Sequence, residues 1–507
     1  MGQPLTQKKS LYQKYTDIMP LGAGALFFIQ MFATFAYSVL YSTLVLYATN
    51  GLHLSDSTAN GVTSSFIAFN YALHLLGGYV GGRFMSYRSL FAIGMVLQVI
   101  GCGLISMPSV DSLYWGLAFF LTGAGLNVTC INCMLTQLFA PDDKRRESAF
   151  LWNYSGMNVG FFVGFSVSGY LQLQNAYHLL FMLAGVGNLI TLFLVFMHWK
   201  KIGDTKTSYL HLPADEKKFA YLKGLAFITT LALALRVLLK NAHASNSLIL
   251  LVGAATIFVI AYFAFKQSSP TAQKKIWAYL ILGLASVVFW TLYQMAPMGL
   301  TLFIERNVDR HYLGLFIAPQ WVQNINTVII IVGGPLLSVF FTWLRDRGIN
   351  ITIPLQFAFA LFIIGVGLAI LPIGIHLADA HGYVNFNWIL WSYICQSIGE
   401  LFISPIGYAM VGQLAPVNLQ GPMMGIWMMT TGVGATLSGY FSNLALSASN
   451  STNPLISNPG FSHAFSLLGW ISIGTGVLLL VVTPFVLRLT QEKKLFAKPQ
   501  MVSPMGL

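Results

Sequence analysis

The chain has 507 residues, of which 56% are hydrophobic and only 8% are charged. A soluble domain usually carries about 25% charged residues, so this composition excludes a large soluble domain and predicts an all-α membrane protein with many spans. A net charge of +12 would suit a nucleic-acid partner, but 23 of the 27 Lys and Arg residues fall in alternate loops between apolar segments. That distribution follows the positive-inside rule. It argues against nucleic acid and predicts a multi-pass protein of the plasma (inner) membrane with both termini in the cytoplasm.

The apolar segments form two sets of six, separated by a charged loop and two further segments. They cover 21–47, 61–82, 89–107, 114–139, 149–171 and 177–198, then 219–240 and 246–266, then 276–300, 314–343, 352–375, 387–415, 421–447 and 464–487. About fourteen spans in this order predict two six-helix bundles with an inserted two-helix hairpin, a known transporter design. The predicted domains are an N-terminal bundle (1–200), a cytoplasmic linker with the hairpin (201–275), and a C-terminal bundle with the tail (276–507).

Span 1 carries a polar stripe. Gln30, Thr34, Tyr37 and Tyr41 stand at i, i+4, i+7 and i+11, so they share one helix face. Two interpretations remain open for this face. It either lines a cavity or forms hydrogen bonds to neighbouring helices.

A single acid interrupts the apolar stretch from Trp388 to Pro416. Glu400 lies about 12 residues in, near the membrane midplane, where a carboxylate costs about 2.5–3.5 kcal/mol on insertion scales. Gln396, Glu400 and Ser404 fall on one helix face, and that face must look into protein or water. We interpret Glu400 as a functional site residue; a buried carboxyl that is neutral or paired is the structural alternative.

Four segments carry a family resemblance: APDDKRRESAFLWNYSGMNVGFFVG, FWTLYQMAPMGLTLFIERNVDR, PQWVQNINTVIIIVGGP and SIGELFISPIGYAMVGQLAP. The first resembles a signature in which acids, a basic pair and S-A-F lead into Y-x-G-x-N-x-G. On these segments the chain resembles the proton-dependent oligopeptide transporter (POT) family of the major facilitator superfamily. The resemblance covers nearly the whole chain. It implies the major facilitator fold and proton-coupled import of short peptides by alternating access.

The resemblance also implies which residues bind substrate. Glu400 meets the amino end of a peptide, and Tyr154, Asn158 and Asn326 hydrogen-bond the ligand. The C-terminal half of the site is lined by Trp290, Gln294 and Trp427. Glu305 takes the place of an acid implicated in proton coupling, beside Glu400 as the first candidate; a gate salt bridge or a solvated loop acid is the alternative for Glu305.

The chain departs from the family pattern in the N-terminal half. Where the family has E-x-x-E-R-F, this chain has Gln30, Ala33, Thr34 and Phe35, and Val128 stands where span 4 carries a Lys. An Arg farther along span 1 is replaced by Tyr41. Losing a whole buried charge cluster together can be energetically neutral, whereas losing one member costs about 3–5 kcal/mol. The resemblance implies that the missing basic groups meet the carboxylate of a zwitterionic peptide. As an alternative to an ordinary short peptide, we therefore expect a substrate with an amine but without a strongly bound free carboxylate, such as an amidated, cyclic or modified peptide or another amine, with altered or absent proton coupling.

Two other classes of function remain open. His376, Asp379 and His381 have a spacing compatible with zinc, which would suit a membrane enzyme. They lie in a short outer loop with no fourth ligand or general base nearby, which favours a solvated loop instead. A non-transporting receptor or scaffold on a transporter fold is the other. The prediction is a transporter rather than an enzyme, monomeric, without cofactor or metal, whose partners are its peptide or amine substrate, protons and the lipid bilayer.

Overall fold

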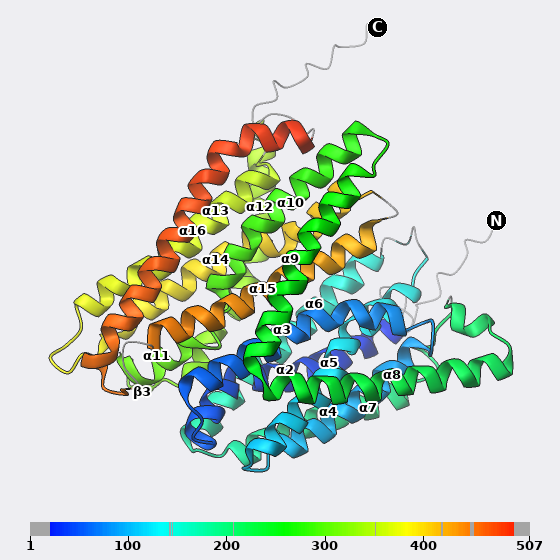
Figure 1. Ribbon diagram of the computed structural model, residues 1–507, viewed down its shortest axis with the longest axis horizontal. Coiled ribbons are helices and arrows are strands. Elements are labelled where there is room, and N and C mark those ends of the chain that lie inside the picture. Colours follow the sequence, from blue (N-terminus) through cyan, green and yellow to red (C-terminus); the bar gives the residue numbers. More distant parts are fainter. Residues whose placement is uncertain are drawn as a thin grey trace, which may run out of the picture. The chain divides into compact units, whose positions relative to one another are not determined.

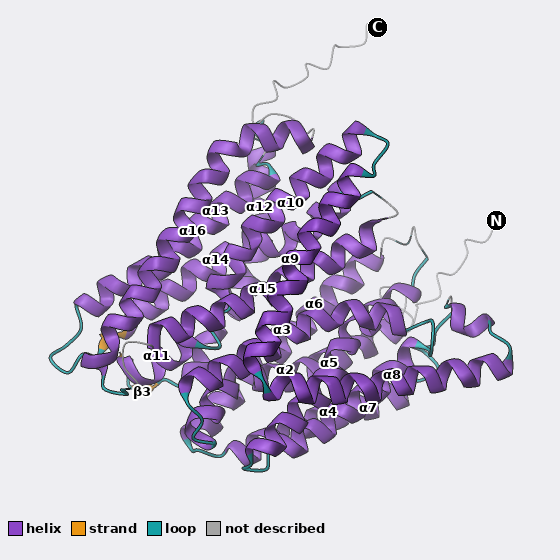
Figure 2. Ribbon diagram, in the orientation of Figure 1, coloured by secondary structure: helices purple, strands orange, loops and turns teal. Residues whose placement is uncertain are grey.

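The computed structural model describes residues 21–140, 143, 145–205, 207–349, 351–416, 419–446 and 451–490. Helices make up most of the described chain (Figure 2). Both termini, for which the charge pattern predicts a cytoplasmic location, lie outside the described residues.

Fourteen of the described helices have 19 residues or more. They are α2 (Leu21–Leu46), α3 (Asp56–Val80), α4 (Tyr87–Ile105), α5 (Val110–Gln137), α6 (Arg145–Leu173), α7 (Tyr177–Met197), α8 (Ala214–Lys240), α9 (Ala242–Phe265), α10 (Pro270–Tyr293), α12 (Pro319–Asp346), α13 (Ile353–His376), α14 (Phe386–Leu414), α15 (Gln420–Leu446) and α16 (Pro454–Thr490). The shorter elements are the π-helical turn η1 (Tyr47–Gly51), the 3-10 turn η2 (Ser208–His211), α11 (Gly299–Asn307), β1 (Val308–Asp309), β2 (His311–Tyr312), β3 (Leu315–Phe316) and β4 (Val384–Asn385).

Most of these helices suit a bilayer. By length and composition, 11 helices of the described chain can cross a membrane, and the remaining long ones are α3, α6 and α15. A span needs about 20 predominantly apolar residues, which these helices supply. The prediction of an all-α membrane protein is confirmed.

The described residues fall into two compact units. Unit 1 comprises the described part of Met1–Leu40 together with Leu73–Lys240, and unit 2 comprises Tyr41–Ala72 with the described part of Asn241–Leu507. The two hairpin helices belong to different units: α8 packs against α5 in unit 1, and α9 packs against α10 and α15 in unit 2. The predicted domain boundaries at 200 and 275 remain a prediction.

In unit 1, small residues bring α6 against α2. Gly156, Gly160 and Gly164 recur every four residues and so lie on one face of α6. A Cβ atom at Gly156 would lie 2.8 Å from the Phe27 carbonyl oxygen, and one at Gly160 would collide with the Met31 carbonyl. The backbones approach closely because these side chains are absent, which is a common way to pack helices in membranes.

Unit 2 uses the same device between α13 and α16, which run side by side (Figure 1). A Cβ atom at Gly365 of α13 would lie 2.9 Å from the Gly469 carbonyl oxygen of α16. One at Gly476 would lie 2.9 Å from the Ala358 carbonyl oxygen. The large apolar side chains of this unit pack around these close contacts.

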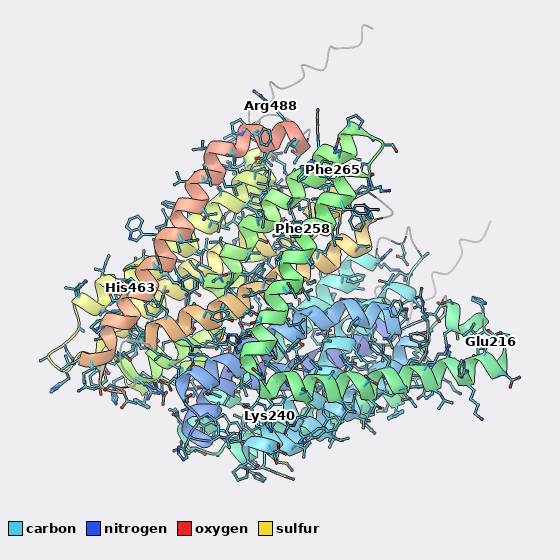
Figure 3. The ribbon with its side chains drawn as sticks, viewed as in Figure 1. Glu216, Lys240, Phe258, Phe265, His463 and Arg488 are labelled. Atoms are coloured by element: carbon cyan, nitrogen blue, oxygen red, sulfur yellow. The ribbon has the colours of Figure 1, made fainter. Side chains whose placement is uncertain are left out.

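Helix α9 presents apolar side chains outward. Phe258 and Phe265, labelled in Figure 3, are 75% and 71% exposed. Large apolar side chains on a helix long enough to span a membrane are expected where lipid, not water, surrounds it. The hairpin helix therefore has the character of a lipid-facing span.

Short strands connect the helix ends of unit 2. β1 pairs in parallel with β4, with Val308 opposite Val384, so the end of α11 is tied to the start of α14. β2 and β3 form a hairpin whose two turn residues, Leu313 and Gly314, have φ values of 51° and 80°. Positive φ at both positions is typical of a type I′ turn. The parallel pair helps to fix α14, the helix that carries Glu400.

Candidate functional site

The site is built around Glu400, the fifteenth residue of the 29 in α14. The residue as a whole has intermediate exposure, between the fully buried core and the open surface. Pro405 stands inside the same helix five residues later and removes the hydrogen bond that the Leu401 carbonyl would otherwise receive. The acid therefore lies at mid-helix, one turn before a weakened stretch of backbone.

The partners of the Glu400 carboxylate are uncharged. The Asn326 side chain, from α12, donates through Nδ2 to Glu400 Oε2 at 2.7 Å and to Ser397 Oγ at 3.2 Å. Tyr293, the last residue of α10, also hydrogen-bonds the carboxylate. Hydrogen bonds to a charged acceptor are roughly twice as strong as neutral ones, so this shell holds the carboxylate without neutralising it.

Three tyrosines interact with the same acid. Tyr71 of α3 and Tyr408 of α14 lie close enough to Glu400 to interact with it electrostatically. Tyr293 packs edge to face with Trp290, with ring centroids 5.4 Å apart, and stacks on Phe289 at 6.1 Å. Tyr293 is therefore held by two ring contacts, and Tyr71 and Tyr408 each interact with Glu400. All of these residues belong to unit 2.

Gln294 and Trp290 lie one turn apart at the end of α10, next to Tyr293. The Tyr41 hydroxyl donates to Gln294 Oε1 at 3.0 Å, and both side chains are buried. Gln294 Nε2 and Trp290 Nε1 are buried donors that have no hydrogen-bond partner among the described residues. A buried donor without a partner is uncommon and costs about 1–3 kcal/mol, so both groups are suited to an incoming acceptor.

The other residues predicted for the C-terminal half have different environments. Ser404 is partly buried one turn beyond Glu400 on α14. Trp427 of α15 is 3% exposed and packs against Gly407 of α14, so tightly that a Cβ atom there would overlap its ring. Trp427 thus contacts the helix that carries Glu400, as a packing residue.

Three of the polar residues predicted in unit 1, Gln30, Thr34 and Asn158, make side-chain hydrogen bonds within their own helices. Gln30 Nε2 donates to Thr34 Oγ1 at 2.9 Å, and Asn158 Nδ2 donates to the Tyr154 carbonyl at 2.9 Å. Tyr154 is 46% exposed, and the Tyr37 ring packs edge to face against an aromatic ring of α6. The roles predicted for these residues in ligand binding stay predictions.

Glu305 belongs to a charged group at the end of α11. It forms an ion pair with Arg310 at 3.0 Å, and neighbouring Arg306 makes a two-bond pair with Asp56 of α3 at 2.6 and 2.7 Å. The salt-bridge alternative for Glu305 therefore has a visible partner, while its role in proton coupling stays a prediction. The zinc alternative has a competing explanation too, because Asp379 Oδ1 accepts the backbone N–H groups of His381 and Tyr383 at 2.9 and 2.8 Å and so shapes a turn.

Sequence reasoning missed part of the shell around Glu400. Tyr293, Tyr71, Tyr408 and Ser397 were not predicted, although Tyr293 stands directly between two predicted residues in the segment FWTLYQ. An i, i+4 argument selects residues on one helix face but does not reveal which residue of another helix reaches them. Tyr293 and Tyr71 come from other helices, so the spacing did not indicate them, whereas Tyr408 continues the series of Gln396, Glu400 and Ser404 by four residues and could have been found.

The described helices define a multi-spanning membrane protein, and α14 carries an acid at its middle. Residues 84–458 match the model of the POT family (PTR2). Dipeptide and tripeptide permease A of Cronobacter turicensis is 30% identical over 473 residues, covering 92% of this chain and 93% of that protein. The same-named protein of Escherichia coli K12 is 29% identical over 471 residues, covering 92% of this chain and 93% of its own.

Solved structures match over a similar length. The crystal structure of a peptide transporter POT in complex with sulfate has a TM-score of 0.82 and 24% identity, covering 93% of this chain and 96% of that one. A POT family transporter in complex with 5-aminolevulinic acid has a TM-score of 0.80 and 21% identity, covering 92% and 97%. The chain belongs to the POT family, and both the resemblance seen in its sequence and the fold expected from it are confirmed.

Proposed function

We propose that this chain is a secondary active transporter that imports short peptides or peptide-like amines by alternating access, coupled to protons. Its family is one of transporters rather than enzymes, and the name of its relatives, dipeptide and tripeptide permease, supports a peptide-like substrate. One observation in the structure supports it most: Glu400, a residue of intermediate exposure at mid-helix, has only neutral hydrogen-bond partners among the described residues. Ionisable residues inside spans generally mark substrate or proton pathways.

Glu400 is proposed to serve both substrate and proton. When ionised, it attracts the ammonium group of the substrate. When protonated, it carries no charge and releases that group. Because one carboxyl cannot hold the proton and the ammonium group at once, import together with a proton requires a second acid to carry the proton. Glu305 is the second candidate for coupling, acting through its ion pair with Arg310.

The remaining parts of the proposal concern the setting of the protein. It is a multi-pass transporter of the plasma membrane, surrounded by lipid. Both termini are proposed to be cytoplasmic, because the Lys and Arg residues concentrate in alternate loops. It is proposed to work as a monomer, with Gln30, Thr34, Tyr37, Tyr154 and Asn158 contributing polar groups from unit 1.

Uptake into proteoliposomes tests the proposal. Purified full-length protein should accumulate a labelled dipeptide or its amide when the outside is acidic, and a protonophore should abolish the accumulation. Glu400→Gln should lower uptake at least about tenfold, because a charged hydrogen-bonded contact is worth about 1.5–3 kcal/mol. Glu216→Gln is a matched control, since Glu216 is exposed in the first turn of α8 (Figure 3).

Each result decides one part of the proposal. Folded protein that moves no peptide or amine would contradict transport and favour a receptor. Uptake that is unchanged by the proton gradient would contradict coupling. Full gradient-driven uptake by Glu400→Gln would remove Glu400 from both roles.

A further inference from the structure

We propose that the Glu400 site selects substrates by an amine and a neutral carbonyl, so that peptides with a masked carboxyl group are preferred over free zwitterionic peptides. Masked means converted to an amide, an ester or a ring. This inference rests on the proposed transport function and narrows its substrate class. It follows from which charges and donors the described residues supply, and which they lack.

The charge of the Glu400 carboxylate is not used in any ion pair of the described residues. The described ion pairs of the chain involve other acids, and Glu400 itself is held by Asn326 and Tyr293. An ion pair within the protein would already satisfy the carboxylate. Without one, its negative charge is available to a cationic group of the substrate.

Lys and Arg residues are almost absent from the predicted spans outside the hairpin. Lys and Arg are absent from the sequence at 21–82, 89–143, 147–199, 276–305, 311–344 and 348–487. These stretches contain nearly all of the twelve spans outside the hairpin. A substrate carboxylate that entered the membrane interior would meet no fixed positive charge there, and an ion desolvated without a partner is strongly disfavoured.

Two side-chain N–H donors at the end of α10 have no hydrogen-bond partner among the described residues. Trp290 Nε1 and Gln294 Nε2 are buried in side chains that are 7% and 0% exposed, and neither has a partner among the described residues. They flank Tyr293, which hydrogen-bonds Glu400. Neutral N–H donors suit a neutral carbonyl oxygen, such as that of an amide or ester, without requiring a full charge.

Three tyrosines lie close to Glu400. Tyr293, Tyr71 and Tyr408 all interact with Glu400. Tyrosine hydroxyls are neutral hydrogen-bonding groups, so they add no positive charge for a substrate carboxylate. Among the described residues, the site therefore has a negative charge for an ammonium ion and neutral donors for a carbonyl, and has no cation for a second negative charge.

Competition in proteoliposomes tests the inference. A labelled probe, alanyl-alanine amide, is exchanged across the membrane at pH 6.5, where its amine is charged. We expect unlabelled alanyl-alanine amide to compete at about tenfold lower concentration than free alanyl-alanine. The amide gains a neutral hydrogen bond, and it does not bring a carboxylate charge that the site leaves without a partner. N-acetyl-alanyl-alanine amide, which lacks the amine, should not compete.

Two variants sharpen the result. Trp290→Phe keeps an aromatic ring but removes the donor, and should reduce the preference for amide over free acid by a few-fold. Glu216→Gln should leave the preference unchanged. Equal or better competition by free alanyl-alanine would overturn the inference while leaving peptide transport intact. If neither compound is exchanged by folded protein, the proposed function itself fails.

Discussion

In unit 2, acids at helix ends form ion pairs with arginines, whereas the acid at mid-helix has neutral hydrogen-bond partners. At the ends, acids are paired with arginines: Asp56 with Arg306 and Glu305 with Arg310. At mid-helix, Glu400 is held by neutral side chains only. In this unit, charge pairing stabilises the helix ends, whereas the mid-helix acid has no charged partner among the described residues and is the one that we propose binds the substrate.

The largest stability effect is expected at the paired end. Arg306→Ala would leave Asp56, which is only 17% exposed, without the partner of its two hydrogen bonds. Removing one member of a buried pair costs about 3–5 kcal/mol, so we expect a loss of about 3 kcal/mol, measured as a lower unfolding temperature in detergent.

A double variant provides the control. Arg306→Ala with Asp56→Ala should be clearly less destabilised than the sum of the two single changes, because no unpaired charge remains. Additive losses would show that the pair does not act as a unit and would break the contrast with Glu400.

The next effect concerns unit 1, where packing rather than charge holds α6 on α2. Gly160→Ala places a Cβ atom against the Met31 carbonyl and should cost about 1–3 kcal/mol of unfolding free energy. Gly24→Ala, on α2 with open space around its Cβ position, is the matched control and should change stability little. Equal unfolding temperatures for the two variants would contradict close helix packing at Gly160.

A smaller effect is expected at Tyr41. Tyr41→Phe removes the donor to buried Gln294 Oε1, which we expect to cost about 1 kcal/mol of unfolding free energy. Tyr262→Phe changes a 57% exposed tyrosine on α9 in the same way and should be neutral. A thermal unfolding series reads out both, and an undisturbed Tyr41→Phe protein would show that this hydrogen bond contributes nothing.

The smallest effect is expected at Asp204, an acid outside the spans, between α7 and η2. Burial raises its pKa above the ordinary value of 3.8, while the Tyr87 N–H at 2.7 Å and nearby Arg88 oppose that rise. A raised folded pKa means that this group favours the folded state when protonated and that the advantage is lost as the pH rises through that pKa. The unfolding temperature of wild type, relative to that of Asp204→Asn, should therefore fall between pH 4 and pH 7. A difference between the two unfolding temperatures that is independent of pH would contradict this.

The sequence alone predicted those features that depend on one helix at a time. Glu400 was identified because an acid within an apolar run is costly, and Gln30 and Thr34 were placed on one face, where they are hydrogen-bonded. Partners from other helices could not be predicted. Tyr41 and Gln294 are 253 positions apart, and Asn326 was expected to bind ligand but not to hold Glu400. Helical spacing fixes direction around one axis, whereas these contacts depend on how several helices are aligned along one another.

Ligand-induced stabilisation of wild type and Glu400→Gln tests the central claim most directly. With alanyl-alanine amide at 100 times its dissociation constant, wild type should gain about 2.7 kcal/mol of stability, seen as a raised unfolding temperature. Glu400→Gln should unfold normally without ligand and lose most of that gain, because the charge that holds the ammonium group is gone. An undiminished ligand shift in Glu400→Gln would contradict the claim that this carboxylate binds the cationic end of the substrate.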